Sequence, residues 1–252
     1  MVPRSKKKVV RLWQRDDGVI DETGRSPMRR NQLERLLEFP SKKKAAERLL
    51  QLFQAGHVKR VQYFQPGMQG RAEFVYYQGR CPAHQILRHS TMVSELRVQT
   101  ARSFTPQQEY KADFFYGNEL VVTSVRPDAA IVAQRGAKTA LVLLEADCGT
   151  ERLISPTAYS LLGKLRDGYA PYFDSEQYQK DFSWAGSLRG FRVALVLLSP
   201  ARLVNIQRLV AANGLDFVLL ATMDDIVRDG IHAPVWRSHD GRTFDLFGRH
   251  HA

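Results

Sequence analysis

Hydrophobic residues in the first third of the chain follow a helical period first and an alternating one afterwards. Ser26-Pro27 is a capping residue followed by the proline that the first position of a helix accepts, and a leucine stripe comes after it at Leu33, Leu36 and Leu37. A second helix is predicted from Ser41 to about residue 55, with an apolar face of Ala45, Ala46, Leu49, Leu50 and Phe53. Runs rich in β-branched and aromatic residues at 58–65 and 71–77 predict two strands joined by a turn. Two helices followed by a hairpin are typical of a winged helix, whose remaining first helix would be short or lie within 16–25.

Helices and strands alternate along the rest of the chain. We expect a helix at 83–102 and, further on, helices at 155–167, 200–212 and 223–228. Strands are predicted at 120–125, 128–134, 139–147, 193–198 and 217–221, and a turn-and-strand segment at 234–247. This order predicts an α/β or α+β fold, in which helices pack on a sheet. We therefore expect a flexible basic arm at 1–15, a winged-helix domain at 16–80 and a sheet domain at 81–252.

Positive charge is concentrated in the first third of the sequence. The formal net charge is +11, and residues 1–80 hold 18 Lys and Arg against 8 Asp and Glu, whereas the rest holds 19 against 18. A basic module of this kind binds polyanions, because neutralised phosphates release their counterions. The alternative is a basic arm that serves solubility. We expect double-stranded DNA to be gripped, without reading of its sequence, by Lys42, Lys43, Lys44, Lys59, Arg60 and Arg71.

Several classes of protein are disfavoured by the same sequence. No apolar run approaches the roughly 18 residues that a membrane span needs, and no apolar stretch follows the basic N-terminus as in a signal peptide. Two cysteines, Cys81 and Cys148, are too few for a disulfide scaffold, so a reducing, cytoplasmic setting is expected. A phosphate-binding glycine loop is missing from the sequence, which disfavours nucleotide hydrolysis.

Three acids and one lysine of the sheet domain are candidates for chemistry. Asp128 opens one predicted strand, and Glu145 and Asp147 end the next, where positions two apart face the same side of a sheet. Carboxylates in this arrangement suit Mg²⁺ or Mn²⁺, which could activate water and stabilise charge on a phosphodiester, with Lys164 as a nearby cation. The alternative is that the acids are solvated strand ends or ion-pair partners of Arg152 and Lys164. We expect Tyr159, Tyr169 and Tyr172 to serve packing rather than nucleophilic attack.

These residues resemble a known motif. The order Pro127-Asp128, Glu145-Ala146-Asp147 and Lys164 resembles the PD-(D/E)xK nuclease superfamily, and the stretch 145–151 followed by Lys164-Leu165 and Tyr169 resembles the bacterial replication-relaxation family. The resemblance implies a restriction-endonuclease-like fold after the winged helix, and a role in plasmid replication or mobilisation beside a relaxase or replication initiator. It also implies that Asp128, Glu145 and Asp147 bind the metal, and that Glu95 on the preceding helix joins them.

One departure from the motif leaves two hypotheses open. The motif has lysine two residues after the glutamate, where this chain has Asp147, so Lys164 would act as a lysine moved to the neighbouring helix. If that helix starts at Ser155, Lys164 lies roughly 13 Å along its axis and must reach back. The first hypothesis is a Mg²⁺- or Mn²⁺-dependent endonuclease using Asp128, Glu145, Asp147 and Lys164. The second is a non-catalytic DNA-binding accessory protein or transcriptional regulator with a degenerate nuclease-like domain, and a dimer is compatible with both.

Overall fold

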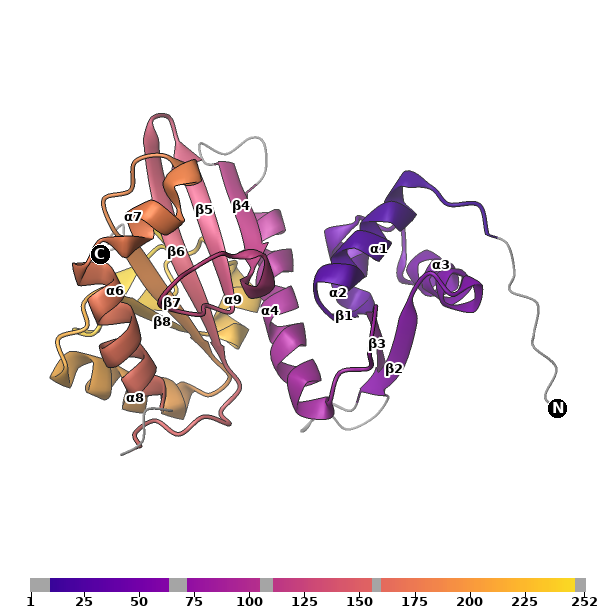
Figure 1. Ribbon diagram of the computed structural model, residues 1–252. Helices are drawn as coiled ribbons and strands as arrows, with labels where there is room; N and C mark the ends of the chain where they lie inside the picture. Colours follow the sequence, from indigo (N-terminus) through magenta and orange to yellow (C-terminus); the bar gives the residue numbers. More distant parts are fainter. Residues whose placement is uncertain (1–9, 64–71, 105–110, 156–159, 248–252) are drawn as a thin grey trace. The chain divides into compact units, whose positions relative to one another are not determined.

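The computed structural model describes residues 10–63, 72–104, 111–155 and 160–247 (Figure 1). The chain forms two compact units, which we call the N-terminal unit (1–98) and the sheet unit (99–252). Their boundary falls within helix α4 (His84–Ser103), later than the boundary after residue 80 that the sequence suggested. Val98 of α4 is buried in the hydrophobic core of the N-terminal unit, which explains why most of this helix belongs there. Within the described residues, no helix is both long enough and apolar enough to cross a bilayer.

The N-terminal unit combines helices with a small antiparallel sheet. In chain order its elements are α1 (Gln14–Arg25), β1 (Met28–Arg29), α2 (Arg30–Leu36), α3 (Lys42–Ala55), β2 (Lys59–Tyr63) and β3 (Glu73–Tyr77). The strands pair in the order β1-β3-β2. Helix α1 occupies the region that the sequence left open between a linker and a first helix, and its Val19 is fully buried beside Leu33 and Leu49. That burial is the reason a segment of polar, turn-forming composition is helical.

Helix α3 begins and ends where its sequence predicts. The Ser41 hydroxyl accepts a hydrogen bond from the backbone N–H of Lys44 at 3.2 Å, which satisfies one donor of the first turn. The helix stops at Gly56, whose φ of 81° lies in the left-handed region that glycine adopts without steric cost. These two signals place three consecutive lysines in the first turn of α3.

Within its described residues, the sheet unit has seven strands in the spatial order β10-β9-β8-β7-β6-β5-β4. Their bounds are β4 (Lys111–Tyr116), β5 (Ala129–Arg135), β6 (Lys138–Asp147), β7 (Phe191–Leu197), β8 (Val218–Thr222), β9 (Trp236–Arg237) and β10 (Thr243–Phe244). Strands β4, β5 and β6 form an antiparallel meander, whereas β6, β7 and β8 run parallel and are joined by helical crossovers. The predicted mixture of helices and a sheet is therefore confirmed.

Helices cover one face of this sheet in Figure 1, where α6, α7 and α8 contribute to one core cluster with its strands. The helical elements are α5 (Leu161–Gly163), the π-helical turn η2 (Lys164–Tyr169), α6 (Ala170–Asp174), α7 (Gln177–Asp181), α8 (Pro200–Ala212) and α9 (Met223–Asp229). Leu141 and Leu143 of β6 belong to the same core cluster as Leu165, Tyr172 and Ile206 of the helices. Because side chains alternate along a strand, Glu145 and Asp147 point to this helix-covered face as well.

In the sheet unit, one predicted strand is wrong and one described strand was missed. Residues 120–125 form a loop, although Leu120 and Val122 are partly buried against the core. Their apolar pattern therefore reflects packing of a loop rather than strand pairing. The missed strand is β4, in which Phe114 and Tyr116 are buried while the alternate positions are more exposed.

Candidate active site

Asp128 is fixed at the end of β6 by backbone contacts. Its N–H donates to the carbonyl of Leu144 at 3.0 Å, and its Oδ2 accepts from the N–H of Ala146 at 2.8 Å. The Gly117 N–H donates to the Asp128 carbonyl at 2.8 Å. A side chain at Gly117 would lie 2.3 Å from the carbonyl oxygen of Pro127, so this close approach requires glycine. The aspartate therefore sits on a turn that is held from both sides.

Glu145 is a buried acid with polar partners on both of its oxygens. Its residue is 3% exposed, and it follows the apolar part of β6. Oε2 accepts from the Lys164 ammonium at 2.5 Å, and Oε1 accepts from the hydroxyl of Tyr169. The sequence predicted that Lys164 would meet the strand-end acids, and the structure brings it to Glu145. The sequence did not predict this hydrogen bond of Tyr169, because we expected that side chain only to pack in the core.

The π-helical turn explains how Lys164 and Tyr169 reach the same carboxylate. The described helix starts after Ser160, whose hydroxyl caps it, so Lys164 lies near the helix start rather than far along its axis as predicted. The Ala170 N–H bonds to the Leu165 carbonyl, five residues back, which marks the wider π winding. In an α-helix residues five apart are about 1.4 turns apart and point away from each other. In this wider turn Lys164 and Tyr169 lie on one side.

Burial and neighbouring charges shift the ionisation of this cluster. Burial, helped by the nearby Asp128 carboxylate, raises the pKa of Glu145 to about 8, against the opposing effect of Lys164. Burial lowers the pKa of Lys164, but Glu145 and Asp128 outweigh it and leave that pKa raised. Burial and the Glu145 carboxylate also raise the pKa of Tyr169 well above its ordinary value. Asp128, Glu145 and Lys164 therefore lie close enough to form one electrostatic unit.

Asp147 does not take the role expected of it. Its Oδ1 accepts from the Gly149 N–H at 2.8 Å and from Arg202 Nη2 at 3.2 Å, and its Oδ2 accepts from Arg202 Nε. Arg202 also donates to the Glu151 carbonyl at 2.5 Å. The acid is thus the partner of an arginine that joins the end of β6 to α8. Arg152, which we had considered as its cation, is exposed.

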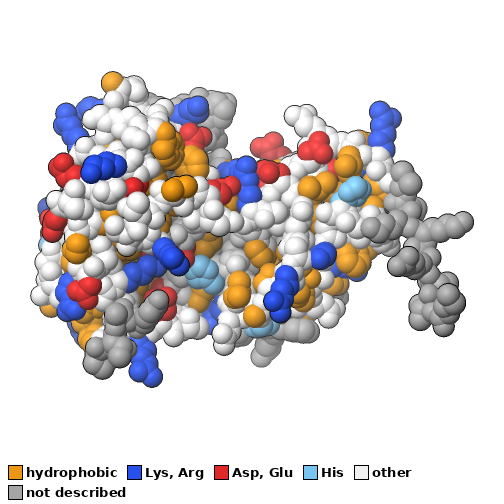
Figure 2. Space-filling view, in the orientation of Figure 1, with side chains coloured by type: hydrophobic (Ala, Val, Ile, Leu, Met, Phe, Trp, Pro, Cys, Tyr) orange, Lys and Arg blue, Asp and Glu red, His pale blue; other side chains and the backbone are white. Residues whose placement is uncertain are grey.

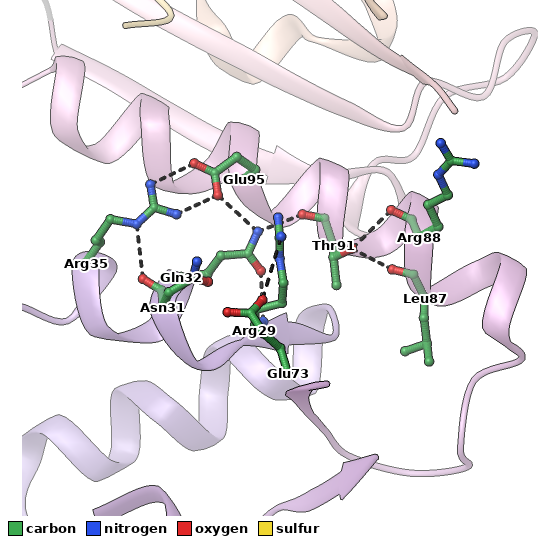
Figure 3. A network of polar contacts seen from close by, with 9 residues as sticks. All are labelled: Arg29, Asn31, Gln32, Arg35, Glu73, Leu87, Arg88, Thr91 and Glu95. Carbon is green, nitrogen blue, oxygen red and sulfur yellow. Dashed lines mark hydrogen bonds and ion pairs between the residues drawn. The ribbon is translucent and has the colours of Figure 1, made fainter. Parts of the chain in front are cut away.

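Glu95, the fourth predicted metal ligand, belongs to a polar network of the N-terminal unit (Figure 3). Its carboxylate accepts two hydrogen bonds from Arg35, at 2.8 and 2.6 Å, and one from the Gln32 amide at 3.2 Å. Gln32 also donates to the Thr91 carbonyl at 2.7 Å. A bidentate arginine with a buried carboxylate is a strong, directional contact. Glu95 therefore fastens α4 to α2, and its prediction as a metal ligand is not supported.

The two remaining acids fit a metal with few protein ligands. Mg²⁺ is commonly held by one or two carboxylates, with water and phosphate oxygens completing its shell. Each oxygen of Glu145 accepts one of the hydrogen bonds above, and a carboxylate oxygen has a second lone pair for a metal. Asp128 and Glu145 are therefore the residues that would hold the ion, and Asp147 does not fit. Among the described residues, no cluster of three His, Cys, Asp or Glu side chains is arranged to hold a metal.

The predicted DNA-binding residues have different surroundings. Lys42, Lys43 and Lys44 are exposed in the first turn of α3, and Lys59 donates to the Gly79 carbonyl. The guanidinium of Arg60 lies between two aromatic rings, 4.3 Å from Phe53 and 4.1 Å from Phe74, and Arg71 lies outside the described residues. On the face shown in Figure 2, Lys and Arg side chains are scattered among hydrophobic ones. Among the described members of the predicted set, the α3 lysines and Lys59 are exposed and Arg60 is partly buried.

Two residues of the site were missed by sequence reasoning, and their signals differ. Arg202 lies in the first turn of a correctly predicted helix, directly after a strand that neighbours β6, so the topology alone could have placed it near Asp147. Tyr169 had no such signal, because nothing in the sequence announces a π-helical turn. Its identification depends on the structure.

Comparisons with known proteins add little to this description. No family model matches the chain, and no curated protein matches it. A solved structure of the restriction endonuclease FokI bound to DNA is similar, with 11% sequence identity and a TM-score of 0.31. The similarity covers 86% of this chain and 44% of the FokI chain. A likeness at that level carries no inference about chemistry.

Proposed function

We propose that this chain binds double-stranded DNA through its N-terminal unit and hydrolyses phosphodiester bonds at Asp128, Glu145 and Lys164. The observation that carries the proposal is the contact of 2.5 Å between the Lys164 ammonium and Glu145, beside the Asp128 carboxylate. These are the acid, acid and lysine of the nuclease-like motif, gathered from a turn, a strand and a helix. An ammonium at this place would face a phosphate that approaches the two acids.

Each residue has a distinct part in this proposal. A Mg²⁺ or Mn²⁺ ion, when bound, supplies the charge that stabilises the phosphodiester in the transition state and a water of lowered pKa. Asp128 and Glu145 would hold the ion, and Lys164 would balance negative charge on the phosphate. Tyr169 acts as a positioning residue, because its hydroxyl fixes the orientation of the Glu145 carboxylate.

DNA binding is supported by the element order and charge of the N-terminal unit. The order α1-β1-α2-α3-β2-β3 with a three-stranded antiparallel sheet is compatible with the winged helix that we propose, in which α3 would be the helix that approaches DNA. Three lysines at the start of α3 are unfavourable to the helix dipole, so their position favours a partner that carries negative charge. A role beside a relaxase or replication initiator, in the cytoplasm, is the setting that the motif resemblance suggests.

The second candidate function is a DNA-binding regulator without catalysis. It is favoured by Asp147, which stands at the lysine position of the motif and is bound to Arg202. In that case the buried charges of the sheet unit would serve only its own stability.

Plasmid cleavage separates the two candidates. Supercoiled plasmid is incubated with the protein and Mg²⁺ or Mn²⁺, and nicked and linear products are measured. We expect cleavage by the unchanged protein and by Arg166→Gln, because Arg166 is an exposed cation of the same π-helical turn that pairs with Asp167. Lys164→Gln and Asp128→Asn should cleave at least about 100-fold more slowly. This factor corresponds to a loss of about 2.7 kcal/mol of transition-state stabilisation. Absence of cleavage by the unchanged protein would favour the regulator.

The salt dependence of DNA binding tests the other half of the proposal. Replacing Lys42, Lys43 and Lys44 by glutamine should lower the slope of log affinity against log salt by up to about three, near 0.9 for each phosphate that is no longer neutralised. The matched control replaces three exposed lysines of the sheet unit, Lys111, Lys138 and Lys180. An unchanged slope in the α3 variant would mean that the α3 lysines do not touch the DNA.

A further inference from the structure

A small hollow beside the start of α3 combines aromatic rings with positive charge. It has a volume of about 260 Å³ and lies between the start of α1, the turn that joins α2 to α3, and the first turns of α3. Trp13, Phe39 and Pro40 supply apolar surface, Arg15, Lys44 and Arg48 supply cations, and the acids Asp16 and Glu47 also line it, so that the cations outnumber the acids by one. Sites for drug-sized ligands measure roughly 300–1,000 Å³, so this hollow suits a single ring system.

Trp13 is exposed and yet held in place. Its residue is 62% exposed, the highest value of any tryptophan among the described residues. Its backbone N–H donates to Asp16 Oδ2 at 2.7 Å, and the guanidinium of Arg48 lies 4.7 Å from the centre of its indole. A large aromatic side chain that is already ordered loses little conformational entropy on binding, which is typical of residues that dominate recognition.

The support under Trp13 is itself rigid. Arg48 donates to Asp16 Oδ1 at 2.8 Å, to Gln51 at 2.8 Å and to the Arg11 carbonyl at 2.7 Å. Asp16 is 1% exposed, so this ion pair is shielded from solvent and balances its own charge. The hollow is therefore built before any ligand arrives.

The remaining charges of the hollow indicate the sign of its ligand. Arg15 lies 5.1 Å from the ring of Phe39, and Lys44 is an exposed lysine with a long contact of 3.7 Å to Glu47. A ligand for this place carries a planar ring and a negative charge together, which is the chemistry of a nucleotide.

We propose that the hollow receives an unpaired base of DNA, stacked against Trp13, with its phosphate near Arg15 and Lys44. Base-paired DNA keeps its bases inside the duplex, so only a single-stranded segment or a displaced base can enter. The proposal rests on the proposed function, because Lys42, Lys43 and Lys44 begin the same helix and would hold the adjoining duplex. The N-terminal unit thus selects a junction between double-stranded and single-stranded DNA.

Binding to three DNAs tests this inference. The first is a blunt duplex, the second carries about five unpaired nucleotides at one end, and the third has the same overhang without bases. Stacking of one base on an aromatic side chain predicts that the second DNA binds about tenfold more tightly than the other two. A 2-aminopurine in the overhang should lose fluorescence on binding. Trp13→Ala should remove both effects, Trp13→Phe should restore part of them, and Trp184→Ala, at an exposed tryptophan of the sheet unit, should change neither.

The outcomes separate this inference from the proposed function. Equal affinity for the three DNAs would overturn the base-binding hollow and leave duplex binding intact. Failure to bind the blunt duplex would overturn the DNA-binding function itself. A preference for the overhang that survives Trp13→Ala, with the fold checked by circular dichroism, would place the unpaired base elsewhere and refute the inference.

Discussion

Replacing Glu145 by glutamine should stabilise the folded protein at neutral and mildly alkaline pH. The change keeps the shape of the side chain and removes its ability to ionise. Burial beside Asp128 raises the pKa of Glu145 from an ordinary 4.5 to about 8. Between these values the folded chain keeps a proton that the unfolded chain releases, so the stability of the unchanged protein falls as pH rises through this window. Lys164 stays charged throughout it, because its pKa is raised.

The size of the effect follows from the same values. At 1.36 kcal/mol for each pH unit, the difference between 4.5 and 8 sets an upper limit of about 5 kcal/mol. Part of this gain is offset, since a glutamine amide offers one acceptor oxygen where Glu145 accepts from both Lys164 and Tyr169. We therefore expect the variant to be about 2 kcal/mol more stable at pH 8, which corresponds to a rise in Tm of about 4–8 °C, and to show little difference near pH 4.5.

Urea denaturation at several pH values, without added divalent metal, measures this effect. The control is Glu151→Gln, at an exposed acid in the loop after β6, and it should show no gain that grows with pH. A variant Glu145→Gln that is less stable than the unchanged protein at pH 8 would refute the reasoning. Stabilisation together with loss of plasmid cleavage would show that this acid is kept at the expense of stability.

Three further changes have defined outcomes. Gly117→Ala should destabilise the sheet unit by about 1–3 kcal/mol in urea denaturation, because its methyl group meets backbone oxygen, whereas Gly168→Ala, whose nearest neighbouring atom would be 3.9 Å away, should not. Asp16→Asn should destabilise the folded protein by about 3 kcal/mol, because it breaks the buried ion pair with Arg48. Arg48 holds the pKa of Asp16 below its ordinary value against the effect of burial, so this contribution to stability is present above about pH 4 and disappears on acidification. Thermal denaturation at several pH values measures both effects. Arg202→Met should leave Asp147 buried and uncompensated, and thermal denaturation should show a loss of about 3 kcal/mol.

Local signals in the sequence predicted the elements that local chemistry determines. Helix α8 occupies the predicted residues 200–212, because Ser199-Pro200 caps its start and Asn213-Gly214 ends it. The predicted strand at 139–147 corresponds to β6, in which the apolar run of the sequence is buried. Residues 120–125 were misassigned, since an apolar loop that packs on a core has the pattern of a strand. Periodicity alone does not separate the two.

The candidate site could be predicted only in part. The spacing of Glu145 and Asp147 placed both acids on one face of β6, which the alternation of a strand requires. Their partners depend on tertiary packing, which brings Lys164 to Glu145 and Arg202 to Asp147. Glu95 was drawn into the metal site by the motif alone, whereas the fold binds it to Arg35. The sequence thus identified the acids, but it did not predict which cation each of them would bind.

The wide turn at 164–169 also sets the phase of everything that follows it. If the same residues were wound as an ordinary α-helix, the downstream helix would be rotated by about 100° about its axis. Tyr172, which is fully buried in the core, would then be turned toward solvent, and its ring would leave that of Phe191, whose centre lies 5.5 Å away. The same π-helical turn therefore determines both the hydrogen bonds to the buried Glu145 carboxylate and the packing of the following helix against the sheet.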